Sequence, residues 1–499
     1  MKQLSGLDAQ FLAMETHAVF GHVGSVCVLA PAPGGQTSGQ TSGQTPHSGP
    51  EEDAFTLEHL TRAIASRLPL VPLLRQRLVE VPLGLDHPYW IDDGSFDIEF
   101  HVRELALPAP GSQRQLQEQV ARLHARPLDR SHPLWEVYLI SGLSEGRVAV
   151  YSKIHHAAVD GISGGDVLAA LLDLSPEGRS VDPIDAFDGE QPPSTLGLLT
   201  RTAITALRQP AQAVRIVSDL AKSSPAIAAL AQGPLTGLVQ AMSSEGRAST
   251  ADLLPGIRLR APRTPFNAPI TPHRRWAAVS LPLAEVKQVR AGTQLTVNDV
   301  VMALCAGALR RWLLAHDALP GSPLVSAVPV SVRTRDQRGA LGNQVSLMFA
   351  AVPTHLETAG ERLAATHQAM AAAKEQHGAL PARLLADVTQ FALPVLANRA
   401  WRLSARLRLL ERASPFNLII SNVPGPPRPL YLAGAELEAY YPVSAVSDGN
   451  GLNITVMSYR GMLHFGLVSC RELVPDLDAM AGHLREELDE MLAEASVAG

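Results

Sequence analysis

Apolar and polar positions along the first 160 residues follow the periods of short strands and amphipathic helices. Residues 22–30 form a nearly continuous apolar run, which predicts a buried strand. Residues 57–68 and 112–126 repeat apolar side chains at spacings of three and four, which predicts two helices. Residues 134–154 contain two apolar stretches around a glycine-containing turn, and this pattern indicates a β-hairpin.

The second half of the chain, from about Thr264, repeats this mixture of strands and helices. Thr296 precedes a long apolar segment and predicts the start of a helix that runs to about Leu314. Because neither half alternates strictly between strand and helix, the pattern favours an α+β fold over a doubly wound parallel sheet. The remaining predicted elements are strands at 276–281, 324–333, 344–352, 416–422, 452–459 and 462–469, and helices at 3–12, 361–376 and 477–492.

Two segments interrupt or separate these halves. Residues 34–50 repeat the tetrapeptide QTSG and have nothing apolar to bury, so we expect a mobile loop inserted after the first strand. Residues 182–263 contain prolines between short amphipathic stretches, and we expect a helical connector there. The expected organisation is therefore an N-terminal half at 1–181, the connector, and a C-terminal half at 264–499.

Composition and charge exclude several classes of protein. The chain is 46% hydrophobic and 18% charged, which excludes disorder of the whole chain. Its formal net charge of −6 disfavours a nucleic-acid-binding protein, because such proteins need a basic face. Cys27, Cys305 and Cys470 have neither metal-ligand spacing nor the pattern of a disulfide framework. We therefore expect no bound metal.

The strongest chemical signal is the string H-H-x-x-x-D-G, formed by His155, His156, Asp160 and Gly161 after the second hairpin strand. Chance alone would produce the full string roughly 0.002 times in a chain of this composition, so the match is informative. Adjacent side chains on a strand point to opposite faces, so one imidazole can face a channel while the other packs inward. No serine or cysteine nucleophile is recognisable nearby, which favours a histidine base that activates a hydroxyl of the substrate.

Other roles for the same residues stay open at this point. The two histidines could both belong to a packed core, or they could bind a metal, although no companion ligands have suitable spacing. For Asp160 we favour a structural role as a buried carboxylate, which would need a cationic partner. Gly161 permits backbone angles that other residues avoid.

Seven further segments accompany the histidine motif along nearly the whole chain. They are LSGLDAQFL at 4–12, PLD at 127–129, PLW at 133–135, VNDVV at 297–301, VPVSVR at 328–333, GNQVS at 342–346 and SNVPGP at 421–426. With these segments the chain resembles the bacterial wax ester synthase/diacylglycerol acyltransferases, members of the CoA-dependent acyltransferase superfamily. The histidine motif alone is shared with the condensation domains of peptide synthetases. The loop at 34–50 departs from the family pattern but lies away from these motifs.

The resemblance implies two similar chloramphenicol-acetyltransferase-like halves with an active-site channel between them. Acyl-CoA would be the donor substrate, with no bound cofactor, and the acceptor would be diacylglycerol, a long-chain fatty alcohol, or both. His156 would take the proton of the acceptor hydroxyl as that oxygen attacks the thioester carbonyl. It would then return the proton to the CoA thiolate.

The resemblance also suggests roles for residues outside the histidine motif. The amide of Asn298 would donate to the tetrahedral oxyanion, although Asn298 or Asp299 could instead cap the helix that begins there. Arg333 ends an apolar strand, where it would either pair with Asp160 or remain solvated at the strand end. Four remaining candidates have two interpretations each: Trp135 forms channel wall or core, and Asn343, Ser421 and Asn422 line the thioester site or hold turns. Pro424 and Gly425 are expected to form a rigid turn between the halves.

The sequence leaves two alternative functions open, and it also bears on where in the cell the protein is found. The first alternative is a condensation-type acyltransferase that depends on a carrier protein, and the second is a non-catalytic lipid-binding protein. The first residues lack a secretory signal, and no apolar stretch reaches the roughly 18 residues that a spanning helix needs. We therefore expect a cytoplasmic protein. It would be peripheral to the inner membrane face or to lipid droplets, because its substrates are insoluble in water.

Overall fold

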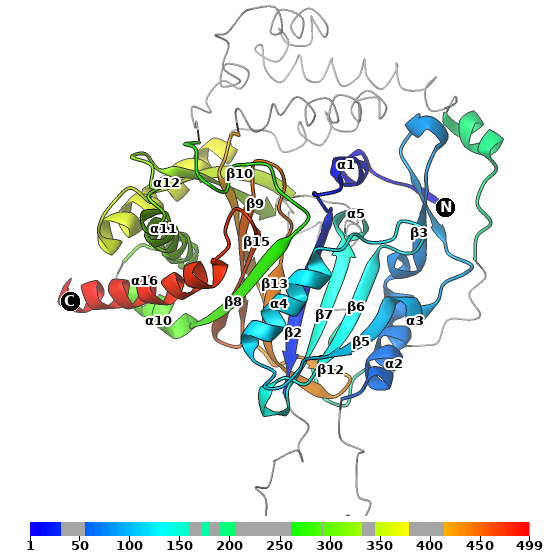
Figure 1. Ribbon diagram of the computed structural model, residues 1–499, viewed down its shortest axis with the longest axis horizontal. Helices are drawn as coiled ribbons and strands as arrows, with labels where there is room; N and C mark the ends of the chain where they lie inside the picture. The colour runs from blue at the N-terminus through cyan, green and yellow to red at the C-terminus, as the bar shows by residue number, and fades with distance from the viewer. Residues whose placement is uncertain are drawn as a thin grey trace, which may run out of the picture.

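The computed structural model describes two sheet-rich halves that lie side by side, the first coloured blue to cyan and the second green to red (Figure 1). The expected loop at 34–50 lies outside the described residues, as do most of the connector, Asp160, Gly161, Arg333 and Asn343. The described residues are 1–30, 55–159, 171–179, 181, 189–202, 204, 261–291, 293–331, 345–378 and 414–498.

The N-terminal half is built on a six-stranded sheet. Its centre is the predicted hairpin of β6 (Trp135–Ser141) and β7 (Val148–His155), which pair antiparallel. β2 (His22–Leu29) pairs antiparallel with β7, so that His22 lies opposite His155. In sheet order the strands are β12 (Tyr431–Leu432), β13 (Ala435–Val443), β2, β7, β6 and β5 (Val102–Ala106).

Two strands of this N-terminal sheet come from the far end of the chain. β13 pairs antiparallel with β2, with Tyr441 opposite Val26, and β12 pairs with β13. The sequence pattern did not predict a strand over β13, because charged residues interrupt its apolar positions. The expected boundary at 264 therefore divides the chain but does not divide the two sheets.

The C-terminal sheet also has six strands. Its order is β10, β9, β11, β14, β15, β8, and β11 runs parallel to both of its neighbours. The predicted hairpin of β14 and β15 is confirmed. The strands are β8 (Arg274–Pro282), β9 (Leu324–Ser331), β10 (Val345–Val352), β11 (Leu418–Pro424), β14 (Leu452–Tyr459) and β15 (Met462–Cys470).

Helices pack against the two large sheets (Figure 1). A third, small sheet pairs β1 (Lys2–Gln3) and β3 (Gln76–Val79) with β4 (Tyr89–Asp92). The first-half helices are α1 (Gly6–Met14), α2 (Leu57–Arg67), α3 (Ile98–His101), α4 (Gln113–His124) and α5 (His156–Val159). The second-half helices are α10 (Leu283–Val289), α11 (Val297–Ala315), α12 (Ala359–Gly378) and α16 (Leu477–Ala498).

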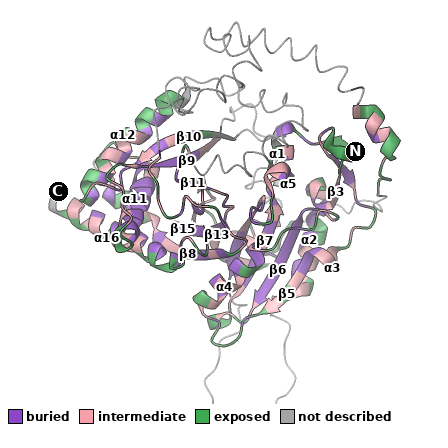
Figure 2. Cartoon of the chain, turned by 45° about the horizontal axis from the view of Figure 1, so that its top comes forward, coloured by how far each residue is buried: buried purple, intermediate pink, exposed green. Residues whose placement is uncertain are grey.

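One hydrophobic core spans the seam between the halves. It contains Val26 and Tyr151 from the N-terminal sheet together with Trp276 and Val468 from the C-terminal sheet. The indole N–H of Trp276 also donates to the carbonyl of Pro442 on β13, at 3.2 Å. Figure 2 shows this continuity as buried residues that run from one sheet into the other. The two halves are therefore packed as one body around the seam.

We expect Gly466→Ala to destabilise this seam. Gly466 on β15 lies so close to β13 that a Cβ there would overlap the Pro442 carbonyl oxygen. Overpacking of this kind typically costs about 1–3 kcal/mol of unfolding free energy, which urea denaturation measures. Gly482→Ala on α16 is the matched control, because nothing lies within 4 Å of its added methyl group. An unfolding midpoint of Gly466→Ala equal to that of the wild type would contradict this interpretation of the seam.

Candidate active site

The paired histidines stand where β7 ends and a short helix begins. His155 is the last residue of β7, and His156 is the first residue of α5. The His155 N–H donates to the carbonyl of Leu134 at 2.9 Å, and the His156 N–H donates to the carbonyl of Gly21 at 2.8 Å. Because backbone bonds on both sides hold the two residues, neither ring depends on a free loop for its position.

His155 points inward. Its side chain is 1% exposed, and Nδ1 accepts a hydrogen bond from the Ala157 N–H at 3.0 Å. Because Nδ1 accepts this bond, the ring proton is on Nε2, which lies 3.2 Å from Oε1 of Glu15. Gly21 packs against this ring so closely that any Cβ there would clash with it.

His156 has a different environment. Its ring is half-buried and stacks on Phe11 of α1, with the centroids 4.2 Å apart and the planes 11° from parallel. Burial, and secondarily the neighbouring His155, lower the pKa of His156 from 6.5 to about 4. The imidazole is thus neutral at pH 7. Its Nδ1 is buried and receives no hydrogen bond from another residue within the described ranges.

The residues at the start of α11 show which side chain caps this helix. Thr296 is the N-cap: its Oγ1 accepts from the Asp299 N–H at 3.2 Å, and Asp299 Oδ2 accepts from the Thr296 N–H at 2.8 Å. Of the two interpretations, capping thus belongs to Thr296 with Asp299, and Asn298 is not the cap. Asn298 Oδ1 instead accepts from Nδ2 of Asn422 on β11, at 3.1 Å.

Asp299 has a further partner on α12. Its buried carboxylate lies 2.9 Å from Nδ1 of His367. Burial raises the pKa of Asp299, but the hydrogen bonds from Thr296 and His367 outweigh it, so the pKa lies below 3.8. The carboxylate is therefore ionised, as a capping box requires, and it ties the start of α11 to α12.

Trp135 adopts the structural one of its two predicted roles. It is 4% exposed and belongs to the core of the N-terminal half. Its indole N–H donates to the carbonyl of Leu74 at 2.7 Å, and its ring stacks on His101. The structure therefore places Trp135 in the core and not in a channel wall.

Ser421 and Asn422 lie inside β11, where they pair with Thr455 and Val456 of β14. The interpretation of these two residues as turn residues is therefore wrong. β11 ends at Pro424 rather than before it. The Gly425 N–H then donates to Ser458 Oγ at 3.2 Å, and a Cβ on Gly425 would clash with the Ser458 carbonyl. This close approach explains the glycine.

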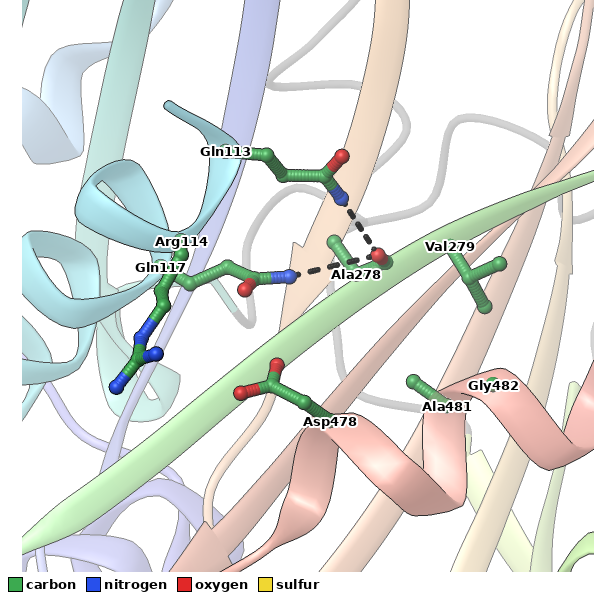
Figure 3. A pocket seen from close by; sticks show the side chains of 8 residues that line it. All are labelled: Gln113, Arg114, Gln117, Ala278, Val279, Asp478, Ala481 and Gly482. Atoms are coloured by element: carbon green, nitrogen blue, oxygen red, sulfur yellow. Dashed lines mark hydrogen bonds between the residues drawn. The ribbon is translucent and has the colours of Figure 1, made fainter. Parts of the chain in front are cut away.

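Two surface clefts lie apart from the histidine pair. One, of about 480 Å³, opens on the seam between α4, β8 and α16, where the Gln113 side chain donates to the carbonyl of Ala278 (Figure 3). The other, of about 330 Å³, includes His367 and Leu295. Neither lining includes His156, so the channel at the catalytic motif stays a prediction.

The contribution of α1 to the surroundings of the histidines was not predicted from the sequence. Phe11 belongs to a recognised segment, but no role was assigned to it, and Glu15 was not identified at all. No local spacing connects these residues with the histidines. The only sequence signal for α1 was that LSGLDAQFL, at residues 4–12, is one of the segments on which the family resemblance rests.

Comparison with known proteins identifies the family. Residues 4–301 match the wax ester synthase/diacylglycerol acyltransferase catalytic domain, and residues 341–492 match the C-terminal domain of the same family. The chain belongs to the wax ester synthase/diacylglycerol acyltransferase family. This membership confirms the resemblance inferred from the motifs, and it makes the protein an acyl-CoA-dependent O-acyltransferase of triacylglycerol or wax ester synthesis.

Relatives and solved structures agree with this family. A putative diacylglycerol O-acyltransferase of Mycobacterium tuberculosis is 36% identical over 502 residues, covering 99% of this chain and 90% of the relative. A wax ester synthase/diacylglycerol acyltransferase structure from Marinobacter aquaeolei has a TM-score of 0.67 at 30% identity, covering 99% of this chain and all of that one. The first condensation domain of the calcium-dependent antibiotic synthetase, at 15% identity and a TM-score of 0.54, covers 99% of this chain and 97% of its own and shares the fold alone.

Proposed function

We propose that this enzyme moves a long-chain acyl group from acyl-CoA to the hydroxyl of diacylglycerol, of a long-chain fatty alcohol, or of both, with His156 as the general base. The observation that carries the proposal is the placement of the His156 ring within a chain whose residues 4–301 match the catalytic domain of the family. His156 begins α5 directly after β7, and its half-buried ring stacks on Phe11 of α1. A neutral imidazole can accept a hydroxyl proton directly.

The acceptor oxygen attacks the thioester carbonyl carbon while His156 takes the hydroxyl proton, which leaves a tetrahedral intermediate with a negatively charged oxygen. Collapse of this intermediate re-forms the carbonyl and breaks the carbon–sulfur bond. The His156 imidazolium returns the proton to the CoA thiolate, so the products are the ester and free CoA.

Asn298 is the proposed donor to the negatively charged oxygen. Because its Oδ1 already accepts a hydrogen bond from Asn422, the orientation of its amide is set and its NH₂ group is directed elsewhere. Thr296 and Asp299 perform the capping, which leaves Asn298 available for the substrate. Ser421 and Asn343 remain proposed parts of the same thioester-binding region.

We propose that Asp160 pairs with Arg333, as a buried carboxylate requires a cation. Single substitutions Asp160→Arg and Arg333→Asp should each lower expression and thermal stability. The double exchange should recover a large part of the loss, because residues in contact are not additive. The melting temperatures of the three variants measure the coupling, and strictly additive losses would argue against the pair.

The acceptor is tested by competition. Purified enzyme is given palmitoyl-CoA with diacylglycerol and a long-chain alcohol together, and the two esters are separated and quantified. Ester formation with free acyl-CoA supports the proposal. Turnover only with an acyl group on a carrier protein would favour the condensation-type alternative, and bound lipid without any ester would favour the non-catalytic one.

We infer that the enzyme works in the cytoplasm at the surface of a membrane or lipid droplet, because diacylglycerol and fatty alcohols are insoluble in water. Over the described ranges, no helix combines the length and apolarity that crossing a bilayer requires. We also propose that residues 182–263 connect the two acyltransferase halves and that the substrate channel runs between them. Co-flotation of the purified protein with diacylglycerol-containing vesicles tests the surface association.

A further inference from the structure

The carboxylate of Glu15 joins α1 to the histidine pair. Glu15 is the C-cap residue of α1, and its side chain is 15% exposed. Oε1 accepts from the Gly21 N–H at 2.8 Å and lies 3.2 Å from Nε2 of His155. Oε2 accepts two bonds from Arg130, at 2.7 Å from Nη2 and 3.2 Å from Nε.

Arg130 fixes this carboxylate in turn. Its Nη2 also donates to the carbonyl of Leu12 at 2.7 Å, so the guanidinium is hydrogen-bonded to both the last turn of α1 and the Glu15 side chain. Burial raises the pKa of Glu15, but His155, Gly21 and Arg130 together lower it to about 2. The group is therefore an anion throughout the working pH range.

The contacts continue from Glu15 to His156. The ring of His155 lies between two partners: Glu15 Oε1 is 3.2 Å from Nε2, and the Ala157 N–H donates to Nδ1. Ala157 follows His156 directly, so the peptide that carries His156 lies between two anchored residues. Phe11 is four residues before Glu15 and therefore on the same face of α1, and it stacks on the His156 ring. One helix face thus contacts both imidazoles.

We propose that Glu15 is a positioning residue for the acyl transfer: its carboxylate orients the His155 ring and, through the contact of that ring with Ala157, the backbone that carries His156. The inference rests on the proposed role of His156 as base. The other ionisable groups recorded around this carboxylate, within the described residues, are Arg130 and Glu80. Glu80 lies 3.4 Å from Nη1 of Arg130, with a side chain that is 69% exposed.

The test compares Glu15→Gln, Glu15→Ala and the matched control Glu80→Gln in the full-length enzyme. Glu80 contacts the same Arg130 but not the histidines. General-base catalysis contributes about 10²–10⁴-fold, so we expect kcat to fall about 10-fold in Glu15→Gln and about 100-fold in Glu15→Ala. The KM for palmitoyl-CoA should change less than about 3-fold, because Glu15 is not proposed to touch the substrate. The kcat and the KM of the control Glu80→Gln should equal those of the wild type.

The pH dependence of kcat/KM distinguishes positioning from loosening. If Glu15 acts only by positioning, its removal leaves the burial of the His156 ring unchanged, so the acid limb should stay near its position in the wild type. A site that merely loosens would hydrate the His156 ring, and the acid limb would then rise towards the ordinary histidine value of about 6.5. Thermal melting is recorded for each variant.

Each result decides the matter in one direction. Lower kcat with an unraised acid limb and a melting temperature near the wild type supports the role of Glu15. A kcat within twofold of the wild type in both Glu15 variants, or an acid limb near 6.5, overturns it. His156→Ala is assayed beside them: if that variant is inactive while Glu15→Gln and Glu15→Ala are normal, only the Glu15 inference fails, whereas an active His156→Ala removes the proposed base as well.

Discussion

His156→Ala is expected to lower kcat for acyl transfer by up to about 10⁴-fold, the upper range for loss of a general base. The physical reason is that the acceptor hydroxyl would lose the neutral imidazole that takes its proton. Release of CoA thiol from palmitoyl-CoA, measured with and without diacylglycerol, reports the loss. His483→Ala is a suitable control, because that histidine lies on α16 and pairs with Glu486.

The same variant should fold normally. The half-buried His156 ring makes a stacking contact with Phe11, and its loss leaves the backbone bond to the Gly21 carbonyl in place. We therefore expect a small change in melting temperature beside a large loss of turnover. Acyl transfer at the wild-type rate by His156→Ala would show that another group removes the proton.

The low pKa of His156 also predicts how the wild type responds to pH. The base is the neutral ring, which predominates above a pKa of about 4. The value of kcat/KM should therefore stay nearly constant from pH 7 to about pH 5 and fall only below that range. An enzyme with an ordinary histidine base would begin to lose activity near pH 6.5.

Asn298→Ala is the second large effect that we expect. Loss of one donor to a tetrahedral oxyanion typically lowers kcat about 10²–10³-fold. Because Thr296 and Asp299 form the capping box, the melting temperature should change little. Steady-state kinetics and thermal melting of the same preparation measure the two effects together.

Thr296→Ala is the control that separates catalysis from capping. Loss of this N-cap should cost about 1 kcal/mol of unfolding free energy and affect kcat less than Asn298→Ala does. Asn422→Ala should reproduce part of the Asn298 defect, because Asn422 holds the Asn298 amide. A large loss of stability in Asn298→Ala with unchanged kcat would assign Asn298 a structural role.

Most regular elements of the two halves were predictable from local patterns. The helices α2, α4 and α11 and the β6–β7 hairpin all follow rules that involve residues a few positions apart. β13 was missed because its alternation is irregular, and it becomes a strand by adding to the edge of β2. That pairing joins distant parts of the chain and leaves no local trace.

The candidate site shows the same division. The histidine motif and Asn298 were identified from the sequence, yet the sequence left open whether Asn298 caps its helix. The structure assigns the cap to Thr296 and brings Asn422 of β11 to the Asn298 side chain. It also places Trp135 in the core, where its indole bonds to Leu74. Each of these outcomes depends on a partner far away in the chain.

The sequence by itself determined the kind of protein: the α+β pattern, the histidine motif and the surrounding segments were enough to indicate the family. Only the tertiary structure decided the surroundings of each imidazole, with His155 buried against Glu15 and His156 stacked beneath Phe11. The reason is physical. Periodicity and caps arise from neighbours within a few residues, whereas burial, pKa and orientation are set by whichever distant side chains the packed core brings into contact.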